Sequence, residues 1–240
     1  MIKDITLRHE LKFLCSDIQL EMIAARLKNI MSYDTNQGSD AYLIRSIYMD
    51  TPGDRYLNES LSGIAERNKY RIRLYNNDSS FIRLEKKYRK YELSQKKSCT
   101  LSCEVVEHIL QKNLEYEECK NTSLLQELYI LTRTENLQPK VIVEYDRTAF
   151  VSEIGNVRVT FDRNLRVGAN VDDFFSTDIM TQSVLPLGRN ILEVKYDGIL
   201  PGYIANAINI GSIEQISFSK YALCRNIIEY NGRIGEGYEY

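Results

Sequence analysis

The chain has 240 residues, of which 43% are hydrophobic and 27% are charged, and its formal net charge is −2. This composition is typical of an ordinary globular protein with enough apolar material for a sizeable core. The slightly acidic balance argues against a surface built to coat nucleic acid, so any basic feature has to be local.

The small numbers of cysteine and histidine residues limit the kinds of active site that the chain can form. The five cysteines are odd in number and form no CxxC pair, which favours reduced thiols in a cytosol. The two histidines, His9 and His108, leave little material for a histidine-rich metal centre or a Ser/His/Asp triad. The first residues do not read as a secretory leader, and no apolar run approaches the roughly 18 residues of a membrane-spanning helix. We therefore expect a cytoplasmic protein that reaches a membrane only through a partner.

In chain order, the pattern predicts an α+β fold dominated by antiparallel strands. A strand over 5–14 is followed by a helix over 17–32, which begins at a capping box formed by Ser16 and Gln19. Alternation of apolar and polar residues predicts further strands at 42–50, 67–76, 81–91, 140–151, 157–162 and 190–197.

Four more segments have helical spacing, and no repeat or linker divides the chain. Consecutive strands are close enough in sequence to pair antiparallel, with the helices decorating the sheet. We expect residues 1–240 to form one domain. The predicted helices lie at 102–112, 122–133, 201–209 and 218–229.

The stretch RNKYRIRLYN, residues 67–76, places a cation at every second position. Alternate side chains of a strand share a face, so Arg71 and Arg73 point one way while Ile72 and Leu74 point the other. Taken alone, such a row favours a surface strand that is charged for solubility. Arg67 and Lys69 continue the row but are expected nearer its rim or in solvent.

Basic residues recur on the later strands, which changes the interpretation. Lys87, Arg147 and Arg158 take such positions, and Glu193 shares a face with Lys195. If the sheet closes into a barrel, these side chains line a tunnel for a polyanion. Arginine offers a planar fork to phosphate oxygens, and a carboxylate among the cations can hold a divalent ion. An empty tunnel of this kind repels itself, so bound phosphate should stabilise the protein.

Eight short motifs, in their order along the chain, resemble the polyphosphate polymerase (VTC) domain family of the triphosphate tunnel metalloenzyme superfamily. The resemblance implies a closed, eight-stranded antiparallel β-barrel around a tunnel, decorated by helices, in a stand-alone member of bacterial type. The motifs are RHELKF (8–13), SIYMDT (46–51), RNKYRIRLY (67–75), RLEKK (83–87), EYDRTAF (144–150), VRVTFD (157–162), LEVKY (192–196) and FSKY (218–221).

The resemblance also implies roles for twelve residues. Glu193 matches the carboxylate that binds Mn²⁺ or Mg²⁺, whereas salt bridging suits Glu10 and Glu85 at least as well. Lys97 is the alternative to Lys96, because the register of QKKS is ambiguous. The expected catalytic residues are Arg71, Arg73, Lys87, Arg147, Arg158 and Lys220, and the expected substrate-binding residues are Lys12, Lys96, Tyr145, Lys195 and Ser219.

The implied activity is transfer of the γ-phosphate of ATP onto a growing inorganic polyphosphate chain, with release of ADP. Pyrophosphate would serve as a primer, a separate membrane protein as a partner, and nucleic acid would have no part. Because a terminal phosphate is already an ionised nucleophile, no general base is needed. The alternatives are an inorganic or nucleoside triphosphatase and a non-catalytic polyphosphate-binding module. The YDRTAF and FSKY motifs favour the polymerase, and the lack of an ExExK motif at the start counts against the triphosphatase.

Overall fold

A computed structural model describes residues 8–35, 37, 41–91, 93–211, 213–217 and 219–236. Every strand in these ranges belongs to one antiparallel sheet. The eight long strands are β1 (His9–Ser16), β3 (Tyr42–Asp50), β4 (Glu66–Tyr75), β5 (Asp78–Lys90), β6 (Leu93–Leu101), β7 (Gln138–Ser152), β8 (Val157–Gly168) and β10 (Arg189–Tyr196). The two-residue strands are β2 (Ser32–Tyr33), β9 (Gln182–Ser183) and β11 (Glu214–Gln215).

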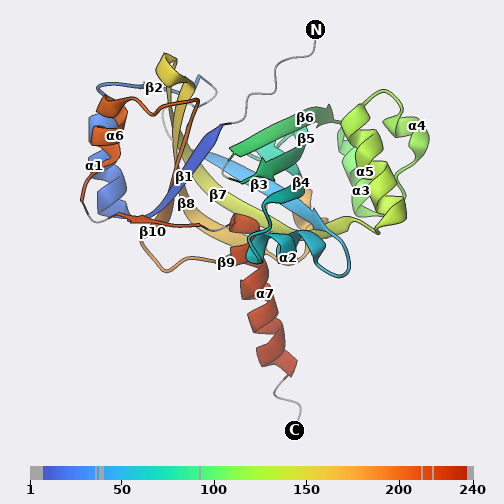
Figure 1. Ribbon diagram of the computed structural model, residues 1–240. Helices are drawn as coiled ribbons and strands as arrows, with labels where there is room; N and C mark the ends of the chain where they lie inside the picture. Colours follow the sequence, from blue (N-terminus) through green and yellow to red (C-terminus); the bar gives the residue numbers. More distant parts are fainter. Residues whose placement is uncertain are drawn as a thin grey trace.

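The long strands follow the order β1-β10-β8-β7-β3-β4-β5-β6, and the sheet curls until its two edges approach (Figure 1). The edges meet at one isolated bridge, in which Arg8 and Ser94 exchange two backbone hydrogen bonds of 3.3 Å. Beyond this bridge, β11 takes the free edge of β1, where it pairs with Phe13 and Leu14. The antiparallel α+β architecture is thus confirmed. The closed barrel is not, since no continuous ladder joins β6 to β1 within the described ranges.

Helices α1 (Asp17–Leu27) and α6 (Gly202–Ile208) cover the outer face of the sheet near β1, β8 and β10 (Figure 1). α1 begins at the predicted capping box, in which the backbone N–H groups of Ser16 and Gln19 each donate to the other's side chain. Val159 and Phe161 of β8 are buried in this apolar layer. Because their side chains point outward, the alternate residue Arg158 points to the inner face of the curled sheet.

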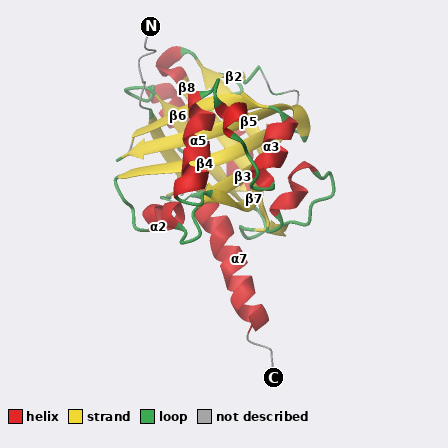
Figure 2. Cartoon of the chain, turned by 90° about the vertical axis from the view of Figure 1, so that its right-hand side faces the viewer, coloured by secondary structure: helices red, strands yellow, loops and turns green. Residues whose placement is uncertain are grey.

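A second helical layer consists of α3 (Cys103–Leu110), α4 (Tyr116–Cys119) and α5 (Ser123–Thr134), which cover the outer face of β5 and β6 (Figure 1 and Figure 2). Ile72 and Leu74 of β4 are buried in the same cluster as Leu125 and Leu128 of α5. This packing explains the apolar half of the alternation in 67–76. The basic half is left to face inward.

Helices α2 (Arg55–Leu61) and α7 (Lys220–Glu236) lie at one end of the barrel, below the sheet in Figure 1. Tyr221 stacks on Tyr48 of β3, with ring centroids 5.2 Å apart. Its hydroxyl donates to Asp50 at 2.6 Å, and the same carboxylate accepts the backbone N–H groups of Tyr56 and Leu57. One buried carboxylate therefore ties both helices to β3, and the start of α7 fills this end of the barrel.

Several boundaries differ from those predicted. The first helix ends at Leu27 rather than at residue 32. The strand β6, the helix α2 and the two 3-10 turns Ile154–Asn156 and Val171–Phe175 were not predicted. The expected strand residues 5–7 and Phe218 of the FSKY motif lie outside the described residues. None of the helices described has the length and apolar character needed to cross a membrane. That residues 1–240 form one domain stays a prediction.

Candidate functional site

The inner face of the sheet encloses a cavity of about 1450 Å³, here called the central cavity. All twelve side chains singled out from the sequence line it, so the motifs do meet in space. Their roles in binding or catalysis stay predictions. The twelve are Lys12, Arg71, Arg73, Lys87, Lys96, Tyr145, Arg147, Arg158, Glu193, Lys195, Ser219 and Lys220.

The charge of the central cavity is strongly one-sided. Among the described residues, thirteen lysine and arginine side chains line it, against the three carboxylates of Glu10, Asp34 and Glu193. Because the whole chain has 31 basic and 33 acidic residues, acidic residues outnumber basic ones in the rest of the chain. The protein thus combines a basic interior with an acidic remainder, an arrangement that draws anions toward the cavity and away from other surfaces.

The two arginines at the centre of β4 are held by hydrogen bonds. Arg71 donates to Glu85 at 2.7 Å and to the hydroxyl of Tyr48 at 2.9 Å. Arg73 donates to the hydroxyl of Tyr145, also at 2.9 Å. Burial would raise the pKa of Glu85, but Arg71 and Arg73 hold it well below its usual range. Both guanidinium groups are therefore fixed and charged before any ligand arrives, as planar recognition of phosphate requires.

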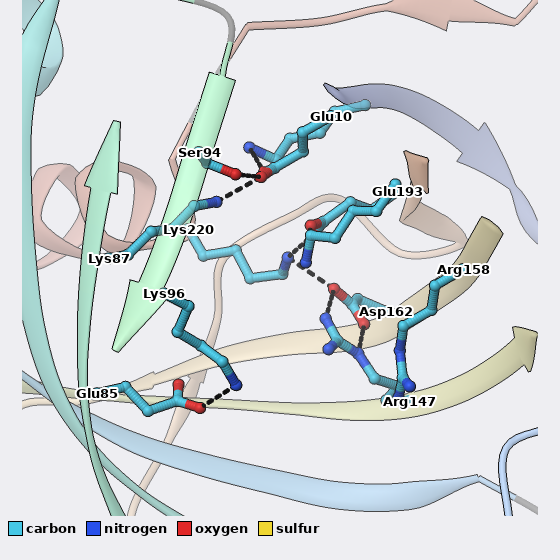
Figure 3. Close-up of polar contacts among 12 residues, drawn as sticks. Glu10, Glu85, Lys87, Ser94, Lys96, Arg147, Arg158, Asp162, Glu193 and Lys220 are labelled. Carbon is cyan, nitrogen blue, oxygen red and sulfur yellow. Dashed lines mark hydrogen bonds and ion pairs between the residues drawn. The ribbon is translucent and has the colours of Figure 1, made fainter. Parts of the chain in front are cut away.

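The register of β6 decides between the two candidate lysines of QKKS. Lys96 pairs with Lys87 of β5 and lines the central cavity, and its Nζ lies 2.8 Å from the carboxylate of Glu85 (Figure 3). Lys97 pairs with Lys86, one residue out of phase, and lines a small pocket away from the central cavity. The structure therefore places Lys96 in the cavity.

Asp162 is a site residue that the sequence analysis missed. Its carboxylate, fully buried, accepts two hydrogen bonds from Arg147, at 2.6 and 2.7 Å, and lies 2.6 Å from Nζ of Lys220 (Figure 3). Burial raises the pKa of this carboxyl, but Arg147 and Lys220 outweigh burial and lower it. Strand alternation offered a signal, because Asp162 lies four residues after Arg158 on the same face.

Two further carboxylates, Glu10 and Glu193, are each paired with a lysine. Glu10 accepts a hydrogen bond from Lys87 at 2.5 Å (Figure 3), and Glu193 lies 2.5 Å from Nζ of Lys195 on the same strand. Burial would raise the pKa of both carboxyls, but the lysines around them lower it. Lys87 itself has a pKa lowered to about 8, because burial and the nearby Lys12 outweigh the attraction of Glu10.

These two carboxylates fit the divalent metal that the family resemblance implies. Oxygen Oε1 of Glu10 is buried and makes no hydrogen bond, although Lys12 forms an ion pair with it at 2.7 Å. No group of three or more candidate ligands occurs among the described residues. Mg²⁺ commonly takes only one or two carboxylates and completes its shell with water and substrate phosphates. Glu193, with Glu10 beside it, would hold such an ion, which would neutralise charge on the phosphates.

Lys69, which the sequence analysis expected near the rim of the row or in solvent, lies inside the central cavity. Its ammonium group is bound by two hydroxyls, Ser60 of α2 at 2.9 Å and Ser219 before α7 at 2.7 Å. No carboxylate within the described ranges forms an ion pair with it. Burial lowers the pKa of Lys69 well below its usual value, and Lys87 and Lys12 lower it further. An anion in the cavity would favour the protonated form of this amine.

Arg158 shows a different arrangement at the other end of the cavity. It forms an ion pair with Asp34 and donates to the hydroxyl of Tyr42 at 3.4 Å. Asp34 is nearly buried and comes from the segment between α1 and β3 rather than from the sheet. Strand alternation could not have found it, because a residue outside the strands has no alternation to follow.

Taken together, these side chains make a preformed cationic cavity that suits phosphate groups. A family model for the VTC domain matches residues 7–228. The chain belongs to the VTC domain family, as its motifs suggested.

Comparisons with individual proteins are more distant. A search of curated sequences finds no match. Among solved structures, a putative adenylate cyclase from Bacillus halodurans is 15% identical, with 84% of this chain and 86% of that chain covered and a TM-score of 0.47. A protein from Pyrococcus horikoshii OT3 is 14% identical (93% and 99% covered, TM-score 0.46), and the Mimivirus capping enzyme triphosphatase is 15% identical (85% and 89% covered, TM-score 0.40). At this distance the likenesses do not bear on function.

Proposed function

We propose that this protein is a polyphosphate polymerase that uses ATP and Mn²⁺ or Mg²⁺. The observation that carries the proposal is the length of the cationic lining. Arg158 of β8 and Arg67 of β4 are both part of it, as are Arg71 and Arg73. β4 alone carries a cation at 67, 69, 71 and 73, a span of roughly 20 Å at 3.3 Å per residue. A lining of this length suits a chain of phosphates better than one triphosphate.

In the proposed reaction, an oxygen of the terminal phosphate of the chain attacks the γ-phosphorus of ATP. The bond from this phosphorus to the β–γ bridging oxygen breaks, so the chain gains one phosphate and ADP leaves. Arg71, Arg73 and Lys220 would neutralise the charge that spreads over the transferring group, and the tunnel would hold donor and acceptor in line. The bound ion would share this task.

The carboxylates of the site favour a phosphate acceptor over water. A general base works best with a pKa near the operating pH. The pKa values of Glu10, Glu85, Asp162 and Glu193 are all held below their usual range by neighbouring cations, in spite of burial. Such weak bases suit an acceptor that is already ionised. The acidic remainder of the chain supports ATP, pyrophosphate and polyphosphate as ligands that enter the tunnel, with no role for nucleic acid.

The test is an assay of purified protein with ATP, Mn²⁺ or Mg²⁺ and a trace of pyrophosphate primer. Polyphosphate is resolved on a gel, and ADP and free phosphate are measured separately. We expect long chains with stoichiometric ADP, and a loss of about 100-fold or more in kcat for Arg71→Ala. Glu193→Gln should also lose activity, whereas Glu153→Gln, an exposed carboxylate outside the cavity, should not. Free phosphate without chains would replace the proposal with a triphosphatase, and tight polyphosphate binding without turnover would replace it with a binding module.

A further inference from the structure

One end of the central cavity is lined by aromatic side chains rather than by charge alone. Tyr42 of β3, Tyr75 of β4 and Phe81 of β5 all line it. The ring centroids of Tyr42 and Tyr75 are 6.2 Å apart, and those of Tyr75 and Phe81 are 6.0 Å apart. The three form one cluster, here called the aromatic mouth.

The aromatic mouth is accessible. Phe81 is 46% exposed, although it lies on the inward face of β5, and Tyr75 is partly exposed. An aromatic ring that only fills a core would be covered, as Phe161 is on the outer face. The guanidinium of Arg83 lies 5.6 Å from the ring centroid of Phe81, so one side of the mouth is also cationic. A flat π-surface beside a cation at a cavity entrance suits a planar aromatic ligand that carries negative charge.

The position of the mouth relates it to the phosphate-binding arginines. Arg73 and Arg71 precede Tyr75 by two and four residues on the same face of β4. They lie roughly 7 and 13 Å from Tyr75 along the strand. A planar group stacked at Tyr75 would therefore leave its phosphates extending inward along the two arginines. Arg158, which reaches the hydroxyl of Tyr42, stands beside the same path.

The opposite end of the cavity has a different character. Arg67 lies eight residues before Tyr75 on β4, roughly 26 Å away along the strand. The cavity is lined there by Leu61, the last residue of α2, by Gly63 and Arg67, and by Arg89 of β5. The rings of His9 and Tyr196 also line the cavity, but they stack on each other, with centroids 5.1 Å apart. A purely inorganic chain of phosphates needs only the cations of this end.

We infer that the aromatic mouth is a nucleobase-binding site, in which the base of the nucleoside triphosphate stacks on Phe81 and Tyr75 while its phosphates extend toward Arg73 and Arg71. The inference rests on the proposed function, because it assigns one end of the tunnel to the nucleotide donor. The basic end at Arg67 and Arg89 is left to the inorganic chain. The site would strengthen the binding of a nucleoside triphosphate, but not that of inorganic triphosphate, which has no base.

The test compares two ligands on the full chain by calorimetry without metal: ATP and inorganic tripolyphosphate. Loss of one stacking contact should weaken ATP binding about 10-fold in Phe81→Ala. Tripolyphosphate, which has no base, should bind this variant as it binds the wild type. Phe81→Trp should restore ATP affinity, because it restores a stacking surface. Tyr116→Ala, which removes an exposed tyrosine on α4, should change neither ligand. Phe81 is half exposed, so the variant should fold, and a thermal melt checks this.

Three results would overturn the inference. Phe81→Ala could leave ATP affinity unchanged, or it could weaken ATP and tripolyphosphate equally, which would make the ring a support for the tunnel wall. ATP affinity could also fail to return with Phe81→Trp. In each case tripolyphosphate still binds the wild type, so the proposed function stands. If neither ligand binds the wild type, the proposed function fails together with the inference.

Discussion

Asp162 and Arg147 face each other across neighbouring strands and form two parallel hydrogen bonds, at 2.6 and 2.7 Å, in a buried position. Lys220, from the start of α7, reaches the same carboxylate. One acidic side chain thus fixes two of the cations expected to act on the transferring phosphate. It also ties α7 to the wall of the barrel.

The variant Asp162→Asn should therefore be destabilised as well as inactive. Removing the charge leaves Arg147 and Lys220 buried without their partner, which typically costs about 3 kcal/mol or more in the free energy of unfolding. Urea unfolding measures this, with Glu153→Gln expected within about 0.5 kcal/mol of the wild type. Tripolyphosphate should recover more stability in Asp162→Asn than in the wild type, because the cavity has gained net positive charge. A variant as stable as the wild type would show that the carboxylate does not hold these two cations.

Glu193→Gln should have opposite effects on two affinities. Removing a carboxylate from a cationic cavity strengthens the binding of tripolyphosphate in the absence of metal, by roughly 3-fold or more. It weakens the binding of Mn²⁺ to the protein with tripolyphosphate present by about 10-fold, since an oxygen ligand is lost. Calorimetry gives the first affinity and Mn²⁺ relaxation measurements the second. Weaker tripolyphosphate binding without metal would mean that Glu193 supports the fold of the site instead.

Bound polyanion should stabilise the protein far more than salt does. The excess of cations in the central cavity is unfavourable when the cavity is empty, and a ligand that binds only the folded state adds about 2.7 kcal/mol at 100 times its Kd. The melting temperature should rise with millimolar tripolyphosphate and change little with sodium chloride at the same ionic strength. Equal effects of the two salts would indicate general screening rather than a bound ligand.

Lys69 should make anion binding depend on pH. Its pKa is well below the usual value in the free protein, because of burial and the charges of Lys87 and Lys12, and a bound phosphate would raise it. Binding of tripolyphosphate should then take up a proton, and affinity should fall as the pH rises through the pKa of the free state. Folding has the opposite sign: the unfolded chain holds the proton to higher pH, so the free energy of unfolding of the empty protein rises with pH over that window.

Calorimetry in metal-free buffers of different ionisation enthalpy counts the protons taken up. Lys69→Arg, which stays charged at every pH, should take up fewer protons than the wild type, and the remainder should come from Lys87, whose pKa is about 8. Lys28→Met, an exposed control on the surface, should match the wild type. Identical proton uptake in Lys69→Arg and the wild type would rule Lys69 out as the titrating group.

Much of the inner lining could be predicted because a strand has a simple period. Arg71 and Arg73 alternate with Ile72 and Leu74, so the sequence alone separates the basic face of the strand from its apolar face. Asp162 obeys the same period and lies on the face of Arg158, but the sequence analysis did not single it out. β6 was missed since LSQKKSCTL has no clean alternation, which also left Lys96 and Lys97 unresolved until the register with β5 was known.

Other features depend on contacts that no local pattern contains. A helix near 218–229 was expected from its spacing, but its place at the end of the barrel depends on Tyr221 meeting Tyr48 and Asp50, far away in the chain. The pairing of β11, two residues long, with Phe13 and Leu14 of β1 likewise joins segments that are far apart in the chain. Such short pairings carry no signal in a sequence pattern.

The separation of charge between the central cavity and the rest of the chain has a consequence for the fate of a product. A protein with a basic exterior that made a long polyanion would bind its own product over its surface. Here thirteen basic side chains line the cavity, and acidic residues outnumber basic ones in the rest of the chain. If the protein makes polyphosphate as proposed, this acidic remainder would repel a chain that leaves the cavity, and the protein would be free to start the next chain.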